Sequence, residues 1–512
     1  MLKNKQWLSG LQSFSVYLKN HKALVVGGLT GLICLYVVLA SLPYLFNEPV
    51  GFDGAIDLQA SVNIVNNGHY ASFGALQNGQ DKIFDPGIST GPSVLLPIAL
   101  VFKIFGVGVV QARIVMLIFY LATICLISWY VYMRSRSWLT ILAPLSLLLV
   151  ISSGINFRLD ILGEMPAAVF AIGSMIAWEK RKLGLAGVLA SLAILCKFLM
   201  IFLLLGGFAC LALDYLLIKK DRKQTLKHAI RWAVGGFTVL GLWELLRSIQ
   251  TGGLRAYRHN LHEYLLFIKY NGSGLGDSGS RGLTILKKSE MMMNNLSMSR
   301  WTMIVLLPVL AYLIFSKKPD WRKSLHSSLY PLAFMVLYLG WWLFISNGSY
   351  TRYTVPLVVV SLAVILASAL EPKQNAFQWI RPACLAALSI SVAITLIQNY
   401  YPYKKPVFLF DLHQQQAIAT RVIKDRQGQL THYGFWQNPE ILLLANLHSL
   451  DIHHLPDNTN YSLLLSPTMR DIVPADYQKA QRLCQNIIFS DSGYIYCSGT
   501  SSKNFLVLKH AQ

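Results

Sequence analysis

The stretch Ala23–Phe46, ALVVGGLTGLICLYVVLASLPYLF, decides the class of this protein. It carries no charged side chain and can cross the hydrocarbon core of a bilayer, which takes a helix of about 20 apolar residues. A helix is needed there because it satisfies its own backbone polar groups. The run is too long for a signal-peptide core and lacks a small-residue cleavage site, so we expect an uncleaved anchor with residues 1–22 in the cytoplasm.

Similar runs recur along the 512 residues, of which 54% are hydrophobic and 13% charged. Soluble proteins average about a quarter charged residues. The pattern therefore predicts an all-α polytopic membrane protein with about 11 spans. The further apolar runs differ in strength and are Val109–Met133, Leu139–Ser152, Phe237–Leu246, Trp301–Phe315, Leu329–Ile345, Tyr353–Leu370 and Ala383–Ile397.

The net charge of +21 follows the topology of these runs. Basic residues gather in short loops between spans, and such loops stay in the cytoplasm. The charge therefore predicts orientation in a lipid bilayer and no nucleic-acid partner. To keep the basic loops on one side, Gly184–Ile218 must be a hairpin of two spans that turns near Lys197. The basic loops are Arg134/Arg136, Lys180–Lys182, Lys219–Lys227 and Lys317–Lys323.

The same orientation places four loops on the opposite side of the membrane, at residues 47–108, 152–160, 250–300 and 347–352. With an odd number of spans, residues 399–512 lie there too, and residues 23–398 form the transmembrane domain. Gly91–Phe105 is short and contains two prolines and a lysine, so we expect an interfacial or re-entrant helix. The 250–300 loop is itself basic, which long loops tolerate.

The segment 399–512 is less apolar and predicts a small soluble α/β or α+β domain. A helical pattern at Leu412–Arg426 alternates with β-rich runs. Cys484 and Cys497 lie in this segment, thirteen residues apart, as a disulfide in an oxidising compartment would; two free thiols are the alternative. The β-rich runs are Tyr461–Leu465, Asn486–Phe489, Gly493–Cys497 and Phe505–Leu508.

Charged side chains gather at the outer ends of the predicted spans, where carboxylates beside cations suit the activation of a hydroxyl and the stabilisation of a departing phosphate. Asp160 and Glu164 lie four apart, on one face if Leu159–Ile176 is helical. They can pair with Arg158 or contact substrate, which we favour, or bind a divalent cation with Asp53. The charged set is Asp53, Asp57, Asp85, Arg158, Asp160, Glu164, Lys197 and Arg352.

Alternative roles remain open for several of these residues. Asp57 can face water or cap a helix, and Lys197 can extend toward the interface as long cations do. Arg352 can be a topology anchor, although on the outer side it would work against the positive-inside rule. Glu244 and Arg247 lie a helical turn apart and should pair. The histidines show no metal-ligand spacing.

The segment from Phe52 to Ala60, FDGAIDLQA, continues to a Gly-His-Tyr turn at Gly68-His69-Tyr70. A carboxylate just after the first span and then an amphipathic helix resembles the GT-C membrane glycosyltransferases, in the branch of the protein O-mannosyltransferases and the lipid A aminoarabinose transferase. Further matches follow in family order across roughly residues 20–370. They are Thr90-Gly91-Pro92 to Phe105-Gly106, Arg113, Arg158-Leu159-Asp160, Leu185–Ala193 with Lys197, and Arg352-Tyr353-Thr354-Val355-Pro356.

The resemblance implies a polyprenyl- (or dolichyl-) phosphate sugar as donor and a glycan, lipid or protein acceptor. It implies Asp53 as the catalytic base and names no cofactor, and a divalent cation stays open as an alternative. The family's Asp-Glu pair is Asp53-Gly54 here, and Phe84-Asp85-Pro86 lacks the lysine of the aminoarabinose enzyme, which argues against aminoarabinose transfer to lipid A. The residues expected to bind substrate are Asp57, Arg158, Asp160, Glu164, Lys197, Arg352 and Tyr353.

The sequence thus predicts an inverting glycosyltransferase of a bacterial inner membrane, with its site on the periplasmic or extracellular side. One alternative is a glycan polymerase or ligase that uses lipid pyrophosphates, for which a basic outer loop such as 250–300 is typical. Another is a transporter or flippase, which would place charges on broken helices near the bilayer midplane. A non-catalytic membrane subunit would follow only if Asp53 were dispensable.

Overall fold

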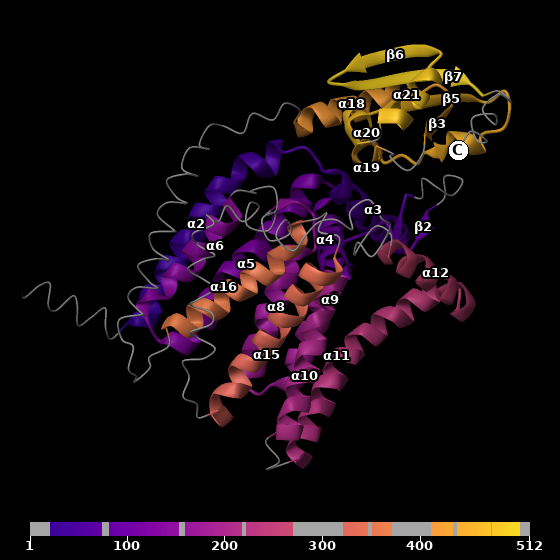
Figure 1. Cartoon of the computed structure of the whole chain (residues 1–512). Coiled ribbons are helices and arrows are strands. Elements are labelled where there is room, and N and C mark those ends of the chain that lie inside the picture. The colour runs from indigo at the N-terminus through magenta and orange to yellow at the C-terminus, as the bar shows by residue number, and fades with distance from the viewer. Residues whose placement is uncertain are drawn as a thin grey trace, which may run out of the picture.

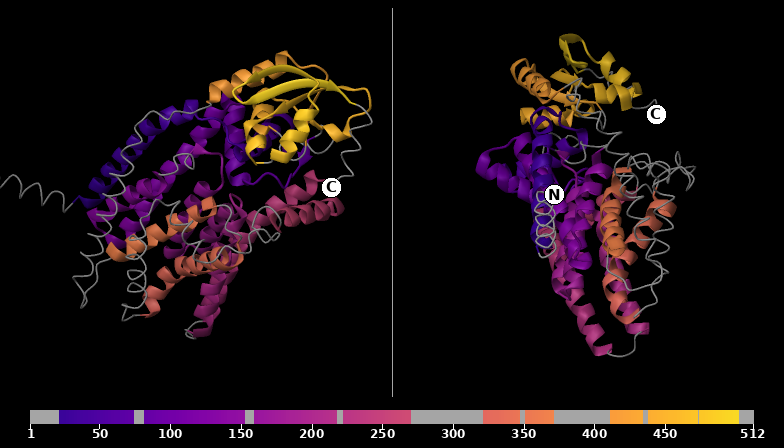
Figure 2. Two further views of the ribbon diagram at one scale, coloured as in Figure 1. Left: turned by 45° about the horizontal axis from the view of Figure 1, so that its top comes forward. Right: turned by 90° about the vertical axis from the view of Figure 1, so that its left-hand side faces the viewer.

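The computed structural model is a helical bundle with a small sheet domain stacked on one end (Figures 1 and 2). The structure describes residues 21–73, 81–152, 159–217, 222–269, 321–346, 351–370, 411–433, 438–472 and 474–501. The predicted spans Trp301–Phe315 and Ala383–Ile397, the strand Phe505–Leu508 and Arg158 lie outside these residues.

Among the residues that the structure describes, four helical segments are long and apolar enough to cross a membrane. They are α2 (Lys22–Asn47), α5 (Val109–Ser135), Phe198–Leu216 and α11 (Arg222–Gln250). Leucines such as Leu32 and Leu39 on α2 are exposed, which suits contact with lipid. The predicted run Phe237–Leu246 is part of the longer α11. Within Phe198–Leu216, the short η2 (Phe198–Met200) leads into α10 (Ile201–Leu217).

Shorter apolar helices complete the described bundle. The predicted hairpin of two spans, Gly184–Ile218, corresponds to α9 (Leu183–Ile194) and α10, with Lys197 between them, and α9 is shorter than a membrane span. α9 packs between α8 (Glu164–Glu179) and α11. The others are η1 (Trp138–Ile141), α6 (Leu142–Ser152), α15 (Trp321–Gly340), η4 (Trp341–Ile345), η5 (Thr351–Thr354) and α16 (Val355–Leu370).

The end of the bundle nearest the sheet domain is built from short elements. α3 (Phe52–Asn67) follows α2 directly and packs on α4 (Pro92–Phe105), the predicted interfacial or re-entrant helix. Between them lies an antiparallel pair, β1 (Ala71–Ser72) and β2 (Lys82–Ile83). α12 (Leu254–Phe267) follows α11 at the same end (Figure 1).

The condition under which Asp160 and Glu164 would share a helical face is not met. α8 starts at Glu164, so Asp160 precedes the helix. Pro166 explains the start, because proline lacks a backbone N–H and is tolerated only in the first helical turn.

The sheet domain has a mixed five-stranded sheet in the order β4-β3-β5-β7-β6. β3 pairs in parallel with β4 and β5, whereas β5, β7 and β6 are antiparallel. Cys484 and Cys497 are joined by a disulfide, with their Cα atoms 5.4 Å apart. The elements are α18 (Leu412–Lys424), β3 (Gln429–His432), α19 (Pro439–Ala445), β4 (Leu450–Asp451), η7 (Ile452–His454), β5 (Asn460–Leu465), α20 (Pro467–Ile472), α21 (Pro474–Arg482), β6 (Asn486–Asp491) and β7 (Tyr494–Thr500).

Candidate active site

α3 carries two aspartates, one helical turn apart, in different surroundings. The Asp53 side chain is 37% exposed, whereas Asp57 is fully buried. The Asp57 carboxylate accepts hydrogen bonds from the backbone N–H groups of Ser89 (2.7 Å) and Thr90 (3.1 Å) and from Ser89 Oγ (3.3 Å). Burial raises the pKa of Asp57 to about 6, against the opposing effects of Lys197 and Thr90. Asp57 thus anchors α3 to the loop before α4, and its direct contact with substrate stays a prediction.

Four charged residues from separate elements form what we call the ionic cluster: Asp53, Glu164, Lys197 and Arg352. Arg352 Nη2 lies 2.5 Å from Asp53 Oδ2, and Arg352 Nε lies 3.6 Å from Glu164 Oε1. Lys197 Nζ lies 3.3 Å from the same Glu164 oxygen and 3.4 Å from Ser89 Oγ. Glu164 therefore holds the two cations side by side, next to Asp53.

The position of Lys197 is fixed by close backbone packing around its turn. The Gly91 N–H donates to Cys196 O (3.0 Å), and a Cβ on Gly91 would lie 2.0 Å from Leu195 O. On the other side, a Cβ on Gly163 would lie 2.2 Å from Cys196 O. Only glycine permits such approaches. The turn before Lys197 is thus wedged between the starts of α4 and α8.

Tyr353 supports both cations of the ionic cluster. Lys197 Nζ lies 5.3 Å from the centre of its ring, and the Arg352 guanidinium carbon 5.7 Å, within the range of cation–π attraction. The Tyr338 hydroxyl donates to Tyr353 O (2.6 Å), which fixes the backbone beside Arg352.

A second group of charges adjoins the cluster and includes a carboxylate that sequence reasoning missed. Arg113 donates to the backbone oxygens of Leu45 (3.3 Å) and Pro49 (2.9 Å). Burial, with the nearby Asp160 charge, raises the pKa of Glu48 to about 7, although Arg113 opposes this shift. Burial likewise raises the pKa of Asp160 to about 6, against Arg113 and Arg352. The signal for Glu48 was its place at the outer end of the first apolar run.

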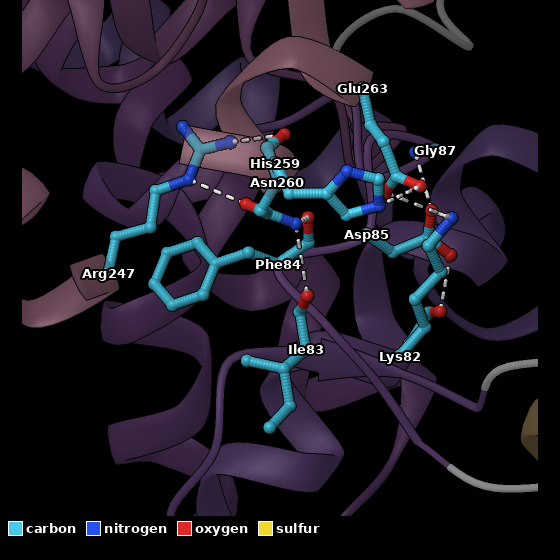
Figure 3. A network of polar contacts seen from close by, with 10 residues as sticks. Lys82, Ile83, Phe84, Asp85, Gly87, Arg247, His259, Asn260 and Glu263 are labelled. Atoms are coloured by element: carbon cyan, nitrogen blue, oxygen red, sulfur yellow. Dashed lines mark hydrogen bonds and ion pairs between the residues drawn. The ribbon is translucent and has the colours of Figure 1, made fainter. Parts of the chain in front are cut away.

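A further polar network ties α12 to the loop before α4 (Figure 3). Arg247 Nε donates to Asn260 Oδ1 (2.8 Å), and Asn260 Nδ2 donates to Phe84 O (3.2 Å). Phe84 has a φ of 50°, and this bond helps to hold its left-handed backbone. The predicted Glu244–Arg247 pair is present at 3.6 Å.

The same network pairs charges from the loop and from α12. Lys82 Nζ lies 3.8 Å from Asp85 and 3.9 Å from Glu263, and His259 lies 3.5 Å from Glu263. Among the described residues, no group of three His, Cys, Asp or Glu side chains is arranged to hold a metal ion.

Comparisons with known proteins agree with this architecture. Residues 89–244 match the family of dolichyl-phosphate-mannose-protein mannosyltransferases. The structure is similar to ArnT from Cupriavidus metallidurans bound to undecaprenyl phosphate, with a TM-score of 0.62 and 13% identity over 92% of this chain and 97% of that chain. For the apo state of that protein, the TM-score is 0.58 at 12% identity, over 92% and 98% of the two chains.

A third similar structure is the Archaeoglobus fulgidus oligosaccharyltransferase in its apo form. Its TM-score is 0.56 at 12% identity, over 95% of this chain and 75% of that chain. A search of curated proteins gives no match. The solved structures and the matched family all belong to the GT-C superfamily, which confirms the resemblance predicted from sequence. Residues 89–244 thus match the mannosyltransferase family, and the structure has the same fold as ArnT and the oligosaccharyltransferase, with helices in its described part that are long and apolar enough to cross a membrane.

Proposed function

We propose that this protein transfers a sugar from a polyprenyl-phosphate donor to an acceptor hydroxyl on the outer face of the membrane, with inversion at the anomeric carbon. Asp53 is the general base. The observation that carries the proposal is the 2.5 Å contact between Asp53 and Arg352, which puts a partly exposed carboxylate beside a guanidinium, a group suited to binding phosphate. The ArnT structure with undecaprenyl phosphate supports this donor class.

In the proposed reaction, the acceptor oxygen attacks the anomeric carbon from the face opposite the phosphate. The new C–O bond forms as the bond to the phosphate oxygen breaks, and the electron pair leaves with the polyprenyl phosphate. Asp53 accepts the hydroxyl proton. Lys197 and Arg352 compensate the charge on the leaving phosphate. A lipid phosphate leaves readily, so the protonating acid of a glycosidase is not required.

Glu164 has a separate role in this mechanism. It lies within 3.3 Å of Lys197 and 3.6 Å of Arg352, so it reduces the repulsion between two neighbouring cations before the donor binds. When the phosphate enters, the cations gain a second anionic partner. Arg352 then links the leaving phosphate to the carboxylate that takes the proton.

We propose a bacterial inner-membrane location, with the site and residues 399–512 on the periplasmic or extracellular side. The basic loops between spans support this orientation. A disulfide between Cys484 and Cys497 suits an oxidising compartment. The donor chain would reach the cluster sideways from the bilayer, and the sheet domain would cover or present the acceptor, whether glycan, lipid or protein.

The test is to incubate the purified protein with a panel of polyprenyl-phosphate sugars and to measure released polyprenyl phosphate. Asp53→Asn should lower the turnover by about 10³-fold, because general-base catalysis contributes about 10²–10⁴. Donor binding should stay near that of the wild type. Asp214→Asn is a matched control, since Asp214 lies near the end of α10 and is not part of the ionic cluster. Full activity of Asp53→Asn would refute the proposed base.

The lipid-pyrophosphate polymerase or ligase remains the second candidate because α12 is a basic outer helix. Its exposed side chains include Arg255, Arg258, His259 and His262. The same donor panel separates the two functions. A requirement for a pyrophosphate-linked oligosaccharide, with no release from monophosphate sugars, would favour this candidate.

A further inference from the structure

The sheet domain contacts the loop that carries Asp53 through a buried glutamine. Gln415 of α18 is 3% exposed. Its Oε1 accepts from Val50 N (2.7 Å), and its Nε2 donates to Val50 O (3.1 Å). The side-chain amide therefore pairs with both backbone groups of one residue, as a neighbouring strand would. Val50 lies between the end of α2 and the start of α3, three residues before Asp53.

Behind Gln415, a buried polar pair continues into the domain. Tyr494 lies next to Gln415 and donates from its hydroxyl to Glu440 Oε1 (3.1 Å). Glu440 is buried in α19, and α19 packs on α3. Gln415 is thus held by its own domain while it contacts Val50, so the pairing joins two ordered surfaces.

The same domain also reaches the other end of α3. His448 Nε2 lies 2.8 Å from Asp81 Oδ1, and the His448 ring lies 4.8 Å from that of Phe73. Asp81 in turn accepts from Asn63 Nδ2 (3.2 Å) and Asn67 Nδ2 (3.1 Å), in the last turn and a half of α3. The sheet domain therefore contacts the segments at both ends of the helix that bears Asp53.

We propose that the sheet domain is a clamp on α3 and that Gln415 is a positioning residue, which sets the place of Asp53 relative to Arg352 and Lys197. The catalytic part rests on the proposed function. A displacement of about 1 Å in a reacting group can cost about 100-fold in rate, so a support three residues away can control turnover. The clamp itself is a structural claim that can be measured without any activity.

The experiment compares Gln415→Glu with Gln416→Glu in the full-length protein. The change at 415 removes the donor to Val50 O and places a carboxylate beside that carbonyl, whereas Gln416 is exposed on the same helix. Amide hydrogen exchange of residues 48–56 should rise in Gln415→Glu and stay unchanged in the control. The turnover number should fall by about tenfold or more, with little change in donor affinity.

The outcomes separate the two claims. Unchanged exchange in Gln415→Glu would overturn the clamp, and faster exchange with unchanged turnover would overturn the positioning role. A fall in donor affinity with unchanged turnover would also overturn that role. If Gln415→Glu does not fold, His448→Leu tests the clamp from the other end by the same exchange measurement at residues 60–67. Full activity of Asp53→Asn would refute the base but leave the exchange result standing.

Discussion

The two surfaces that hold α3 are built from opposite chemistry. On the bundle side, Asp53 meets the charges of Arg352, Lys197 and Glu164. On the domain side, the loop before α3 meets the neutral amide of Gln415, and both of its hydrogen bonds go to the backbone. The Asp53–Arg352 pair is partly exposed, and exposed ion pairs are weak and can exchange partners. The buried amide pair, in contrast, has one geometry. The first surface suits binding of a charged substrate, and the second suits positioning.

Removal of charge from the ionic cluster should have the largest effect on transfer and is the strongest test of this comparison. Arg352→Gln should lower single-turnover transfer by about 10²–10³-fold, as loss of one charge-stabilising group does. Thermal stability should change much less, because one of its two ion pairs, with Asp53, is partly exposed. Arg352→Lys should fall between the two, since it keeps the charge and loses the planar fork. A rate for Arg352→Gln within threefold of the wild type would contradict the proposed role.

Loss of the disulfide should lower the stability of the sheet domain and leave turnover nearly unchanged, the reverse of the expectation for Arg352→Gln. Replacing both Cys484 and Cys497 with Ser removes a cross-link over a separation of 13 residues. For such a loop the expected loss is about 3 kcal/mol of the stability of the sheet domain. The resistance of that domain to a protease, followed as the temperature rises, measures this loss of stability. Turnover at a temperature at which the domain stays folded should be close to that of the wild type. A large fall in turnover at that temperature would contradict the separation of the two surfaces into substrate binding and positioning.

The smallest expected effect is a pH dependence from Glu440. Burial raises the pKa of Glu440 from 4.5 to about 7 in the folded protein. The folded state therefore holds a proton that the unfolded state has lost, and the stability from this residue is complete below pH 4.5 and is lost as the pH rises through about 7.

Glu440→Gln should remove this pH dependence. Its melting temperature relative to the wild type should rise by a few °C between about pH 5 and about pH 8. Melting curves over this range check the prediction, with Glu263→Gln, at a half-exposed residue of α12, as the control. Parallel pH dependences of the wild type and Glu440→Gln would show that Glu440 is not neutral in the folded domain.

Much of the fold and part of the site follow from the sequence for one reason: lipid leaves few choices. Uncharged runs such as Ala23–Phe46 must be helices, and charges such as Asp53, Lys197 and Arg352 are confined to the helix ends, where they meet. The start of α8 at Glu164 separates Asp160 from the helix, and Pro166 in the first turn is the sequence signal for that start. The contact of Glu164 with two cations could not be predicted, because a periodic sequence pattern gives no distances between side chains of different elements.

The support from the sheet domain could not be predicted for a different reason. Gln415 is one of three consecutive glutamines and carries no charge, so its residue type gives no signal. The position is marked only by helical spacing, which places it beside Ile418 and Ala419 on the buried face of α18. The parallel strand β3 was missed because QLTH is short and polar at its first residue.

Gln415 recognises main-chain atoms of Val50, and this has a consequence for divergence. The side chain at position 50 can mutate without removing either hydrogen bond, provided that it is not proline, which lacks the N–H. A contact of this kind tolerates substitutions in the loop without loss of either hydrogen bond. The contact between the bundle and the sheet domain therefore places little demand on the sequence of the loop between α2 and α3.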